Sequence, residues 1–189
     1  MIAALFVLAD GPYSGLSNVD PWPESRDARL YSGPWPVVAH PPCERWSRVG
    51  ARHGRIGEDG GCFASALASA RRWGGVLEHP EGSAAYAAHG LAAPRRGRGW
   101  IASGGGMACA VAQGHYGHRA TKWTWLLYFG DASPPDLNWG SHDAQPGATP
   151  RERRIGIVQR LSRRQRQITP IPFRDLLISL ASASVPTGG

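Results

Sequence analysis

The chain has 189 residues with a formal net charge of +7, and hydrophobic residues make up 42% of it. This length and composition exclude an intrinsically disordered chain and are typical of one globular domain. The longest apolar stretch near the N-terminus, MIAALFVLA, is too short to cross a bilayer and lacks the features of a signal peptide. We therefore expect a cytoplasmic protein with no membrane partner. The basic excess, with arginines clustered in PRRGR, RERR and RLSRRQR, favours nucleic acid as the partner.

Short apolar runs alternate with turn-forming segments in the first part of the chain. Residues 4–9 predict a first strand, and DGPYSGL after them predicts a loop. Residues 23–32 predict a short helix. The segment WPVVAH predicts a short buried strand, which ends at Pro41 and Pro42 because proline cannot donate to a sheet ladder.

A helix and a strand follow in the middle of the chain. Residues 60–73 are rich in Ala and carry apolar residues at helical spacing, which predicts a helix. The segment VLEHP then predicts a buried strand with Glu78 at its carboxyl end. Strand, helix and strand in this order predict an α/β fold with a compact, mostly parallel sheet. Ligands bind beyond the carboxyl ends of such strands, where both PPC and EHP lie.

The remaining segments complete a core of residues 1–130. Residues 84–92 predict a short helix, ACAVAQGHYG predicts a strand leading into a turn, and KWTWLLYFG predicts an aromatic strand. Residues 131–166 are a polar and then Arg-rich excursion that we expect to contact DNA. Residues 167–189 contain a C-terminal helix, capped by Thr169, that we expect to pack back on the core.

Cys43 is the first candidate catalytic residue. A thiol is a useful nucleophile only where its thiolate is stabilised and reachable. Cys43 meets both conditions at the mouth of a parallel sheet, before a loop that carries Arg45 and Arg48. The alternative is a buried structural cysteine, the usual state of this residue type, and the apolar surroundings of Cys62 and Cys109 assign those two residues to that state.

Glu78 is the second candidate, because a carboxylate that ends an apolar strand should face the same mouth as Cys43. A thiol can add to an electrophilic ring carbon while a carboxyl group holds or protonates the ring nitrogen opposite. The alternative is an ordinary solvated loop acid.

A metal site is not expected. The three cysteines are odd in number and show no CxxC pairing, which excludes a disulfide framework and a four-Cys zinc site. His115 and His118 in QGHYGH lack the further ligands that a closed zinc site needs.

Four segments resemble landmarks of the DNA cytosine carbon-5 methyltransferases and cover about half the chain. HPPCERWSRVG resembles the Pro-Pro-Cys catalytic loop, with Glu44 in place of Gln and Trp46 in place of Phe, while Ser47 and Gly50 are kept. VLEHP resembles the family's Glu-Asn-Val strand end, with His79 in the Asn place. QGHYGHRATKWT resembles the Gln-x-Arg-x-Arg region, and more closely the Gly-His…Lys-x-Thr form of small phage-type relatives. ITPIPFRDLLISLA resembles the C-terminal helix that carries Val-Pro-Pro.

The resemblance implies a reduced Rossmann-like methyltransferase fold with little or no target-recognition domain, encoded by a phage or prophage and acting on DNA in a bacterial cytoplasm. Cys43 would attack carbon 6 of a flipped-out cytosine and make carbon 5 nucleophilic. Glu78 would bind ring nitrogen 3 and the exocyclic amine, and Arg119 or Lys122, the only lysine, would contact the ring carbonyl oxygen or a phosphate. The other residues expected at the substrate or at DNA are Pro42, Arg45, Ser47, Arg48, His79, Gln113, His118, Arg163 and Arg164.

The segments that would bind the methyl donor differ most from the motifs of this family. S-adenosylmethionine is the implied donor, with Asp10, Gly11 and Gly15 in place of the Phe-x-Gly-x-Gly loop and Asp20 in place of the ribose-binding acid. The short chain before PPC leaves room for one or two strands. Two alternatives remain: a module that binds bases without catalysis, and a Cys-dependent enzyme acting on free pyrimidine nucleotides, since thymidylate synthases also use a Pro-Pro-Cys nucleophile. The sequence does not give the oligomeric state.

Overall fold

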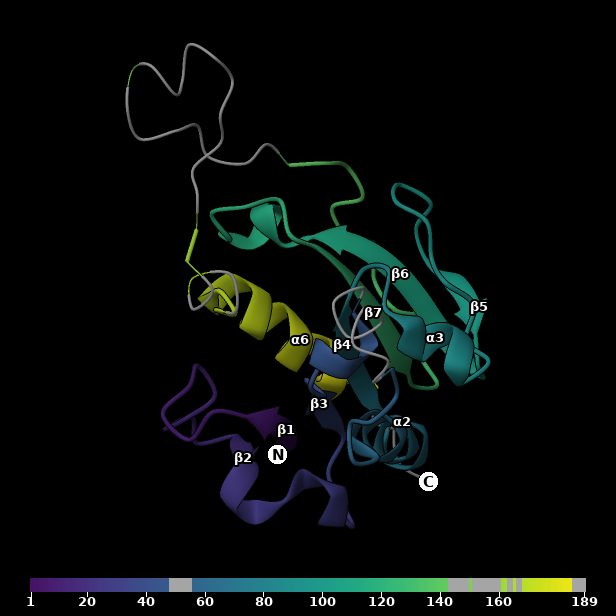
Figure 1. Cartoon of the computed structure of the whole chain (residues 1–189). Helices are drawn as coiled ribbons and strands as arrows, with labels where there is room; N and C mark the ends of the chain where they lie inside the picture. Colours follow the sequence, from purple (N-terminus) through teal and green to yellow (C-terminus); the bar gives the residue numbers. More distant parts are fainter. Residues whose placement is uncertain (48–55, 143–149, 151–160, 163–164, 166–167, 185–189) are drawn as a thin grey trace.

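The fold is a seven-stranded sheet with helices on both faces (Figure 1). A computed structural model describes residues 1–47, 56–142, 150, 161–162, 165 and 168–184. The strands are β1 (Ile2–Val7), β2 (Val19–Pro23), β3 (Val37–Ala39), β4 (Gly75–Pro80), β5 (Ile101–Ser103), β6 (Gly106–Ala112) and β7 (Trp123–Phe129). The helices are α2 (Cys62–Trp73), α3 (Ala84–Ala88) and α6 (Ile171–Ala183), and the short 3-10 helices are η1 (Glu24–Arg26), η2 (Ala28–Leu30), η3 (Glu44–Trp46) and η4 (Gln113–Tyr116).

The sheet is mixed rather than mostly parallel in its pairing. In the order β2-β1-β3-β4-β7-β6-β5, the first four strands pair in parallel and the last three pairings are antiparallel. The prediction of an α/β fold is confirmed, and the prediction of a mostly parallel sheet holds only for β1 to β4. Short connections explain the difference: the turn at residues 104–105 and the segment 113–122 are short enough to join antiparallel neighbours.

Strand β2 was not predicted, because Pro21 and Pro23 argue against a strand. It is an edge strand, where the missing N–H groups can face away from the sheet. Residues 8–18 connect β1 to β2 without a helix. The predicted helix over residues 23–32 is wrong: two 3-10 turns stand there, separated by Asp27, whose backbone has φ 46. A left-handed residue interrupts a continuous helix at that point.

Two apolar layers sandwich the sheet because side chains alternate along each strand. One layer joins α2 to Leu5, Val37 and Leu77, and the other joins α6 to Ala4, Val38 and Val76 (Figure 1). Burial of each large apolar side chain stabilises the fold by roughly 1.5–3 kcal/mol. The α2 residues in the first layer are Phe63, Ala66, Leu67 and Ala70, and the α6 residues in the second are Phe173, Leu177, Leu180 and Ala181.

One edge of the sheet gathers four segments that are distant in sequence. The carboxyl ends of β1, β3 and β4 lie there because these strands are parallel. The register of β7, which pairs Thr124 with both Pro80 and Val111, brings the β6–β7 connection to the same edge. Residues 8–18, 40–47, 78–83 and 113–122 therefore meet at one edge, which we call the carboxyl edge.

Candidate functional site

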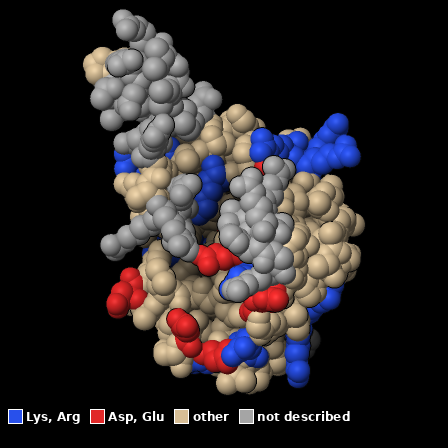
Figure 2. All heavy atoms as spheres, viewed as in Figure 1, with Lys and Arg blue, Asp and Glu red and all other residues tan. Residues whose placement is uncertain are grey.

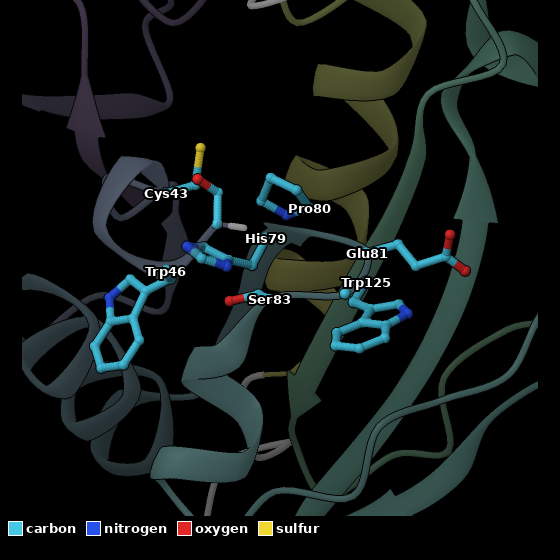
Figure 3. A pocket seen from close by; sticks show the side chains of 9 residues that line it. Cys43, Trp46, His79, Pro80, Glu81, Ser83 and Trp125 are labelled. Atoms are coloured by element: carbon cyan, nitrogen blue, oxygen red, sulfur yellow. The ribbon is translucent and has the colours of Figure 1, made fainter. Parts of the chain in front are cut away.

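Cys43 lies at the carboxyl edge, between β3 and η3, and lines a cavity of about 450 Å³. It is a thiol and not part of a disulfide. Trp46 and Trp125 flank His79 and Ser83 in this cavity (Figure 3). The lining residues are Cys43, Trp46, Ser47, His79, Pro80, Glu81, Gly82, Ser83 and Trp125. We call this space the aromatic cavity.

The walls of the aromatic cavity are held rigidly. The Trp46 indole N–H donates to an Asp59 carboxylate oxygen at 2.7 Å, and the backbone N–H of Phe63 donates to the same oxygen at 2.8 Å, so this wall is fixed to the start of α2. The His79 ring stands edge-on to Phe63, with centroids 5.2 Å apart. A mostly apolar, preformed space with few polar groups is the usual form of a small-ligand site.

Three buried polar atoms of the aromatic cavity have no hydrogen-bond partner among the described residues: both ring nitrogens of His79 and the indole nitrogen of Trp125. The Pro42 carbonyl lies near the His79 ring but outside hydrogen-bond geometry. Burial lowers the pKa of His79 to about 4, against weaker raising effects of Glu78 and the Pro42 carbonyl. His79 is therefore a neutral imidazole at pH 7. Buried polar groups normally have partners, so these atoms are the least satisfied polar atoms of the aromatic cavity wall.

Glu78 faces the opposite side of β4 from His79, because neighbouring side chains on a strand alternate. It is not a wall of the aromatic cavity. Its side chain is 13% exposed and accepts hydrogen bonds from His40 Nδ1 at 3.1 Å and from Gln113 Nε2 at 3.2 Å. Gln113 also donates to Thr124 Oγ1 at 2.8 Å, and Tyr13 Oη lies 2.8 Å from His40 Nε2. We call these five residues the Glu78 network.

The Glu78 network fixes the charge of its carboxylate. Burial raises the pKa of Glu78, but the hydrogen bond and charge of His40, with weaker electrostatic effects of Lys122 and His79, outweigh burial and lower the pKa to about 2. Burial also raises the pKa of Tyr13, so its hydroxyl keeps its proton. In the neutral tautomer that satisfies both contacts, Tyr13 donates to His40 Nε2 and His40 Nδ1–H donates to Glu78.

Lys122 acts electrostatically on the region of Cys43 and Glu78. Burial lowers the pKa of Lys122, and the negative charges of Glu78 and Cys43 raise it in opposition, so its ammonium lies within electrostatic reach of both groups. Its backbone has φ 39, the left-handed region that a residue with a side chain rarely adopts. The Gln113 backbone N–H donates to the Lys122 carbonyl at 3.1 Å and holds this conformation. Backbone strain of this kind concentrates at functional sites.

The turn before Lys122 carries two more of the expected residues. His118 is buried, and its Nδ1 accepts the Ala120 backbone N–H at 3.0 Å, so the imidazole shapes the turn. Arg119 is exposed on the same turn. Near Cys43, Pro42 is exposed and Arg45 is half-buried. Arg48, Arg163 and Arg164 lie outside the described residues.

The residues expected at a methyl donor do not come together. Asp10, Gly11 and Gly15 lie in the loop after β1, at the carboxyl edge. Asp20 pairs in register with Ala3 at the amino end of its strand, so it faces the opposite edge. Its carboxylate is already occupied by the Arg26 guanidinium at 2.5 Å and the Trp22 indole N–H at 2.8 Å. The assignment of Asp20 to a ribose is therefore not supported by its position.

Glu24 stands where Asp20 was expected, directly after β2 at the carboxyl edge. It borders an open cavity of about 480 Å³ lined by Val7, Leu8, Ala9, Pro23, Glu24 and Ser25. Leu8 is 77% exposed there. In doubly wound sheets an acid at the end of the second strand binds ribose hydroxyls. The donor set of one carboxylate, one hydroxyl and several apolar side chains fits a nucleoside.

A basic loop borders the aromatic cavity. Arg96 forms an ion pair with Glu81, a cavity wall, and stacks over the Trp123 ring at 4.5 Å. Arg95 and Arg98 are exposed and form no salt bridge among the described residues. Figure 2 shows the blue side chains gathered over the loop that precedes β5. We call residues 94–98 the basic loop.

No protein-family model, curated protein or solved structure matches the chain. Within the described part of the chain, no group of three or more His, Cys, Asp or Glu side chains could hold a metal ion. No helix among those residues is long and apolar enough to cross a membrane.

Several residues of the carboxyl edge were not predicted from the sequence. The sequence pattern that could have identified them is different for each residue. His40 directly precedes PPC, and strand alternation alone places it on the side of β3 opposite to Ala39. Tyr13 lies inside DGPYSGL, where a fully buried aromatic residue has no local signal. Glu24 was not identified, because the two prolines of β2 argue against the strand that it follows. Trp125 alternates with Thr124 in an aromatic strand, a pattern that was visible but not assigned to a site.

Proposed function

We propose that this protein modifies carbon 5 of cytosine in DNA through a covalent adduct with Cys43. The observation that carries the proposal is the position of Cys43: it lines a cavity at the carboxyl edge, and Lys122 lies within electrostatic reach of both Cys43 and Glu78. An ammonium group beside a thiol stabilises the thiolate, which is the reactive form. This chemistry agrees with the resemblance of HPPCERWSRVG and VLEHP to the DNA cytosine carbon-5 methyltransferases.

The strand order supports a ligand site at this edge. From β1 the chain moves outward to β2 and then returns to the other side of β1 to form β3. In α/β sheets the crevice at such a reversal is where ligands bind. The loops after β1 and β3, which carry Tyr13 and Cys43, border that crevice. We take the fold as a reduced Rossmann-like methyltransferase fold on this basis.

In the proposed reaction the thiolate of Cys43 bonds to carbon 6 of the target cytosine. The ring would lie over the carboxyl edge between Cys43 and Glu78, and the aromatic cavity would hold the neighbouring part of the flipped nucleotide. Tryptophan faces such as those of Trp46 and Trp125 favour stacking with bases. After group transfer to carbon 5, loss of the carbon 5 proton and departure of the thiolate restore the aromatic ring.

S-adenosylmethionine is the methyl donor that we propose. Its ribose hydroxyls would bind Glu24, and its adenine would contact Leu8 and Pro23 in the open cavity beside the ends of β1 and β2. Bound there, S-adenosylmethionine supplies an electrophilic methyl group. Glu24, rather than Asp20, is the ribose-binding acid in this proposal.

DNA is the partner that the basic loop favours. Arg96 is braced by Glu81 and Trp123, so the backbone of the loop is held at the rim of the aromatic cavity. Arg95 and Arg98 project from that braced loop and would contact phosphates. Phosphates on both sides of a flipped nucleotide would lie near such a rim.

The proposal is tested by trapping the protein on duplex DNA that contains 5-fluorocytosine, with S-adenosylmethionine present. We expect a denaturation-resistant complex with the wild type and with Cys62→Ser, a matched cysteine control that does not line the aromatic cavity. Cys43→Ser should form none. Absence of the complex in the wild type, or its persistence in Cys43→Ser, would contradict the proposal.

A further inference from the structure

The Glu78 network contains a hydrogen-bonded series of three titratable residues, Tyr13, His40 and Glu78, and the reaction above gives no role to Tyr13 or His40. Tyr13 Oη lies 2.8 Å from His40 Nε2, and His40 Nδ1 lies 3.1 Å from Glu78 Oε2. The three residues come from the β1–β2 loop, the end of β3 and β4, so the fold brings them together from distant parts of the chain. The inference that we draw from these three residues rests on the proposed function.

Because Glu78 is charged, its hydrogen bond to ring nitrogen 3 of cytosine requires an added proton. Its pKa is lowered to about 2, so at neutral pH it is a carboxylate that can only accept hydrogen bonds. Ring nitrogen 3 of cytosine is also an acceptor. A carboxylate alone therefore cannot bond to nitrogen 3, and a proton has to be supplied between them.

We propose that His40 is the proton donor that serves Glu78. In the imidazolium form, His40 transfers the proton on Nδ1 to Glu78 Oε2, and Glu78 gives a proton to ring nitrogen 3 as Cys43 Sγ bonds to carbon 6. The carbon 5–carbon 6 double bond moves to carbon 4–carbon 5, and the electron pair of the nitrogen 3–carbon 4 double bond takes the proton. A thiolate and an imidazolium are consumed, and a neutral adduct and a neutral imidazole remain.

Tyr13 suits this role because a hydroxyl can act in both protonation states of His40. It accepts from Nε2–H of the imidazolium and donates to Nε2 of the imidazole. Its own raised pKa prevents it from losing the proton itself. Tyr13 is therefore a positioning residue that keeps the His40 ring aligned with Glu78 while the proton moves.

Other charged or titratable groups act on these three residues. Lys122, directly before β7, and His79, the neighbour of Glu78 on β4, lie within electrostatic reach of Glu78. Arg174 and Asp175, from the first turns of α6, face Tyr13, and the Arg174 guanidinium donates to the Pro12 carbonyl at 2.8 Å in the same loop. Since none of these side chains is altered in the variants below, their contribution is common to all of the proteins compared.

The test measures the rate of adduct formation on 5-fluorocytosine DNA across pH for the wild type, His40→Gln and Tyr13→Phe. The Gln side chain keeps an N–H donor for Glu78 but cannot carry the proton. We expect the rate of His40→Gln to fall by about 10²-fold, the usual size of a general-acid contribution. The pH profile of the rate should differ in shape between the wild type and His40→Gln, because only the wild type supplies a proton through His40.

Tyr13→Phe keeps the buried ring and should keep the shape of the wild-type pH profile at a lower rate, because it removes only the hydroxyl that positions the His40 ring. It serves as the second variant if His40→Gln does not fold, and circular dichroism checks both. A wild type that forms no adduct at any pH overturns the proposed function and this inference together. A wild type that forms the adduct, with His40→Gln equally fast and equally pH-dependent, or with Tyr13→Phe as fast as the wild type at every pH, overturns the His40 inference alone.

Discussion

Replacement of Glu78 by Gln should change how the stability of the protein depends on pH. The pKa of Glu78 is lowered from 4.5 in an unfolded chain to about 2 in the folded protein, because the His40 hydrogen bond and nearby positive charges outweigh its burial. A shift of this size corresponds to about 3 kcal/mol of folding free energy. Since the folded pKa is the lower one, this stabilisation is complete above the unfolded pKa and is lost as pH falls towards the folded pKa.

With these two pKa values, about 2 kcal/mol of the stabilisation should be lost between pH 6 and pH 3. Urea unfolding of the wild type and of Glu78→Gln at several pH values measures the free energy of unfolding of each. Acids elsewhere, such as Asp20 and Asp27, titrate in both proteins and cancel in the difference.

We expect the stability difference between the wild type and Glu78→Gln to shrink by about 2 kcal/mol from pH 6 to pH 3. His40→Gln should reduce this change, because it removes the group whose hydrogen bond and charge hold the pKa of Glu78 down. A difference that stays constant over this range would refute the electrostatic account of the Glu78 network.

Two further predictions concern the ligand surfaces. The double change Arg95→Ala and Arg98→Ala should weaken DNA binding and reduce the slope of log affinity against log salt by about 2, whereas Arg72→Ala, an exposed arginine of α2, should leave it unchanged. Fluorescence anisotropy at several salt concentrations measures this, and equal slopes in all variants would contradict the assignment of the basic loop. Glu24→Gln should weaken S-adenosylmethionine binding in calorimetry by about 10-fold, the effect of one hydrogen bond to a charged group, and Asp20→Asn should not. A larger loss of affinity in Asp20→Asn than in Glu24→Gln would instead identify Asp20 as the ribose-binding acid.

The elements with strong local patterns could be predicted from the sequence. The Ala-rich spacing of residues 60–73 predicted α2, and the apolar runs before PPC and within VLEHP predicted β3 and β4. The same reasoning put Cys43 and Glu78 at strand ends, and both lie at the carboxyl edge. The local patterns sufficed here because helix periodicity and buried strands are encoded over a few neighbouring residues.

The contacts within the site could not be predicted, because they join residues that are far apart in the chain. The His40–Glu78 hydrogen bond and the Tyr13–His40 contact depend on which strands are neighbours and on which face each side chain takes. The pattern of residues along the sequence specifies neither the neighbouring strands nor the face of each side chain. Glu78 and His79 are adjacent in sequence yet serve the Glu78 network and the aromatic cavity on opposite faces of β4.

Glycine 75 shows how closely those neighbouring strands approach. A Cβ atom at Gly75 would lie 2.0 Å from the Val37 carbonyl oxygen, and the residue has φ 118, so only glycine permits the pairing of β3 with β4. The Gly-Gly pair also ends α2, with Gly74 at the C-cap. It also sets the distance between the two strands that carry Cys43 and Glu78 to the carboxyl edge.

The central claim is that Cys43 drives modification of cytosine in DNA, and the product tests it most directly. DNA from cells that produce the wild type or Cys43→Ser is digested to nucleosides and analysed by mass spectrometry. The account predicts a cytosine nucleoside carrying an added group at carbon 5 in the wild-type sample and none in the Cys43→Ser sample. Unmodified cytosine in both samples, from cells that contain folded, DNA-binding protein, would contradict it.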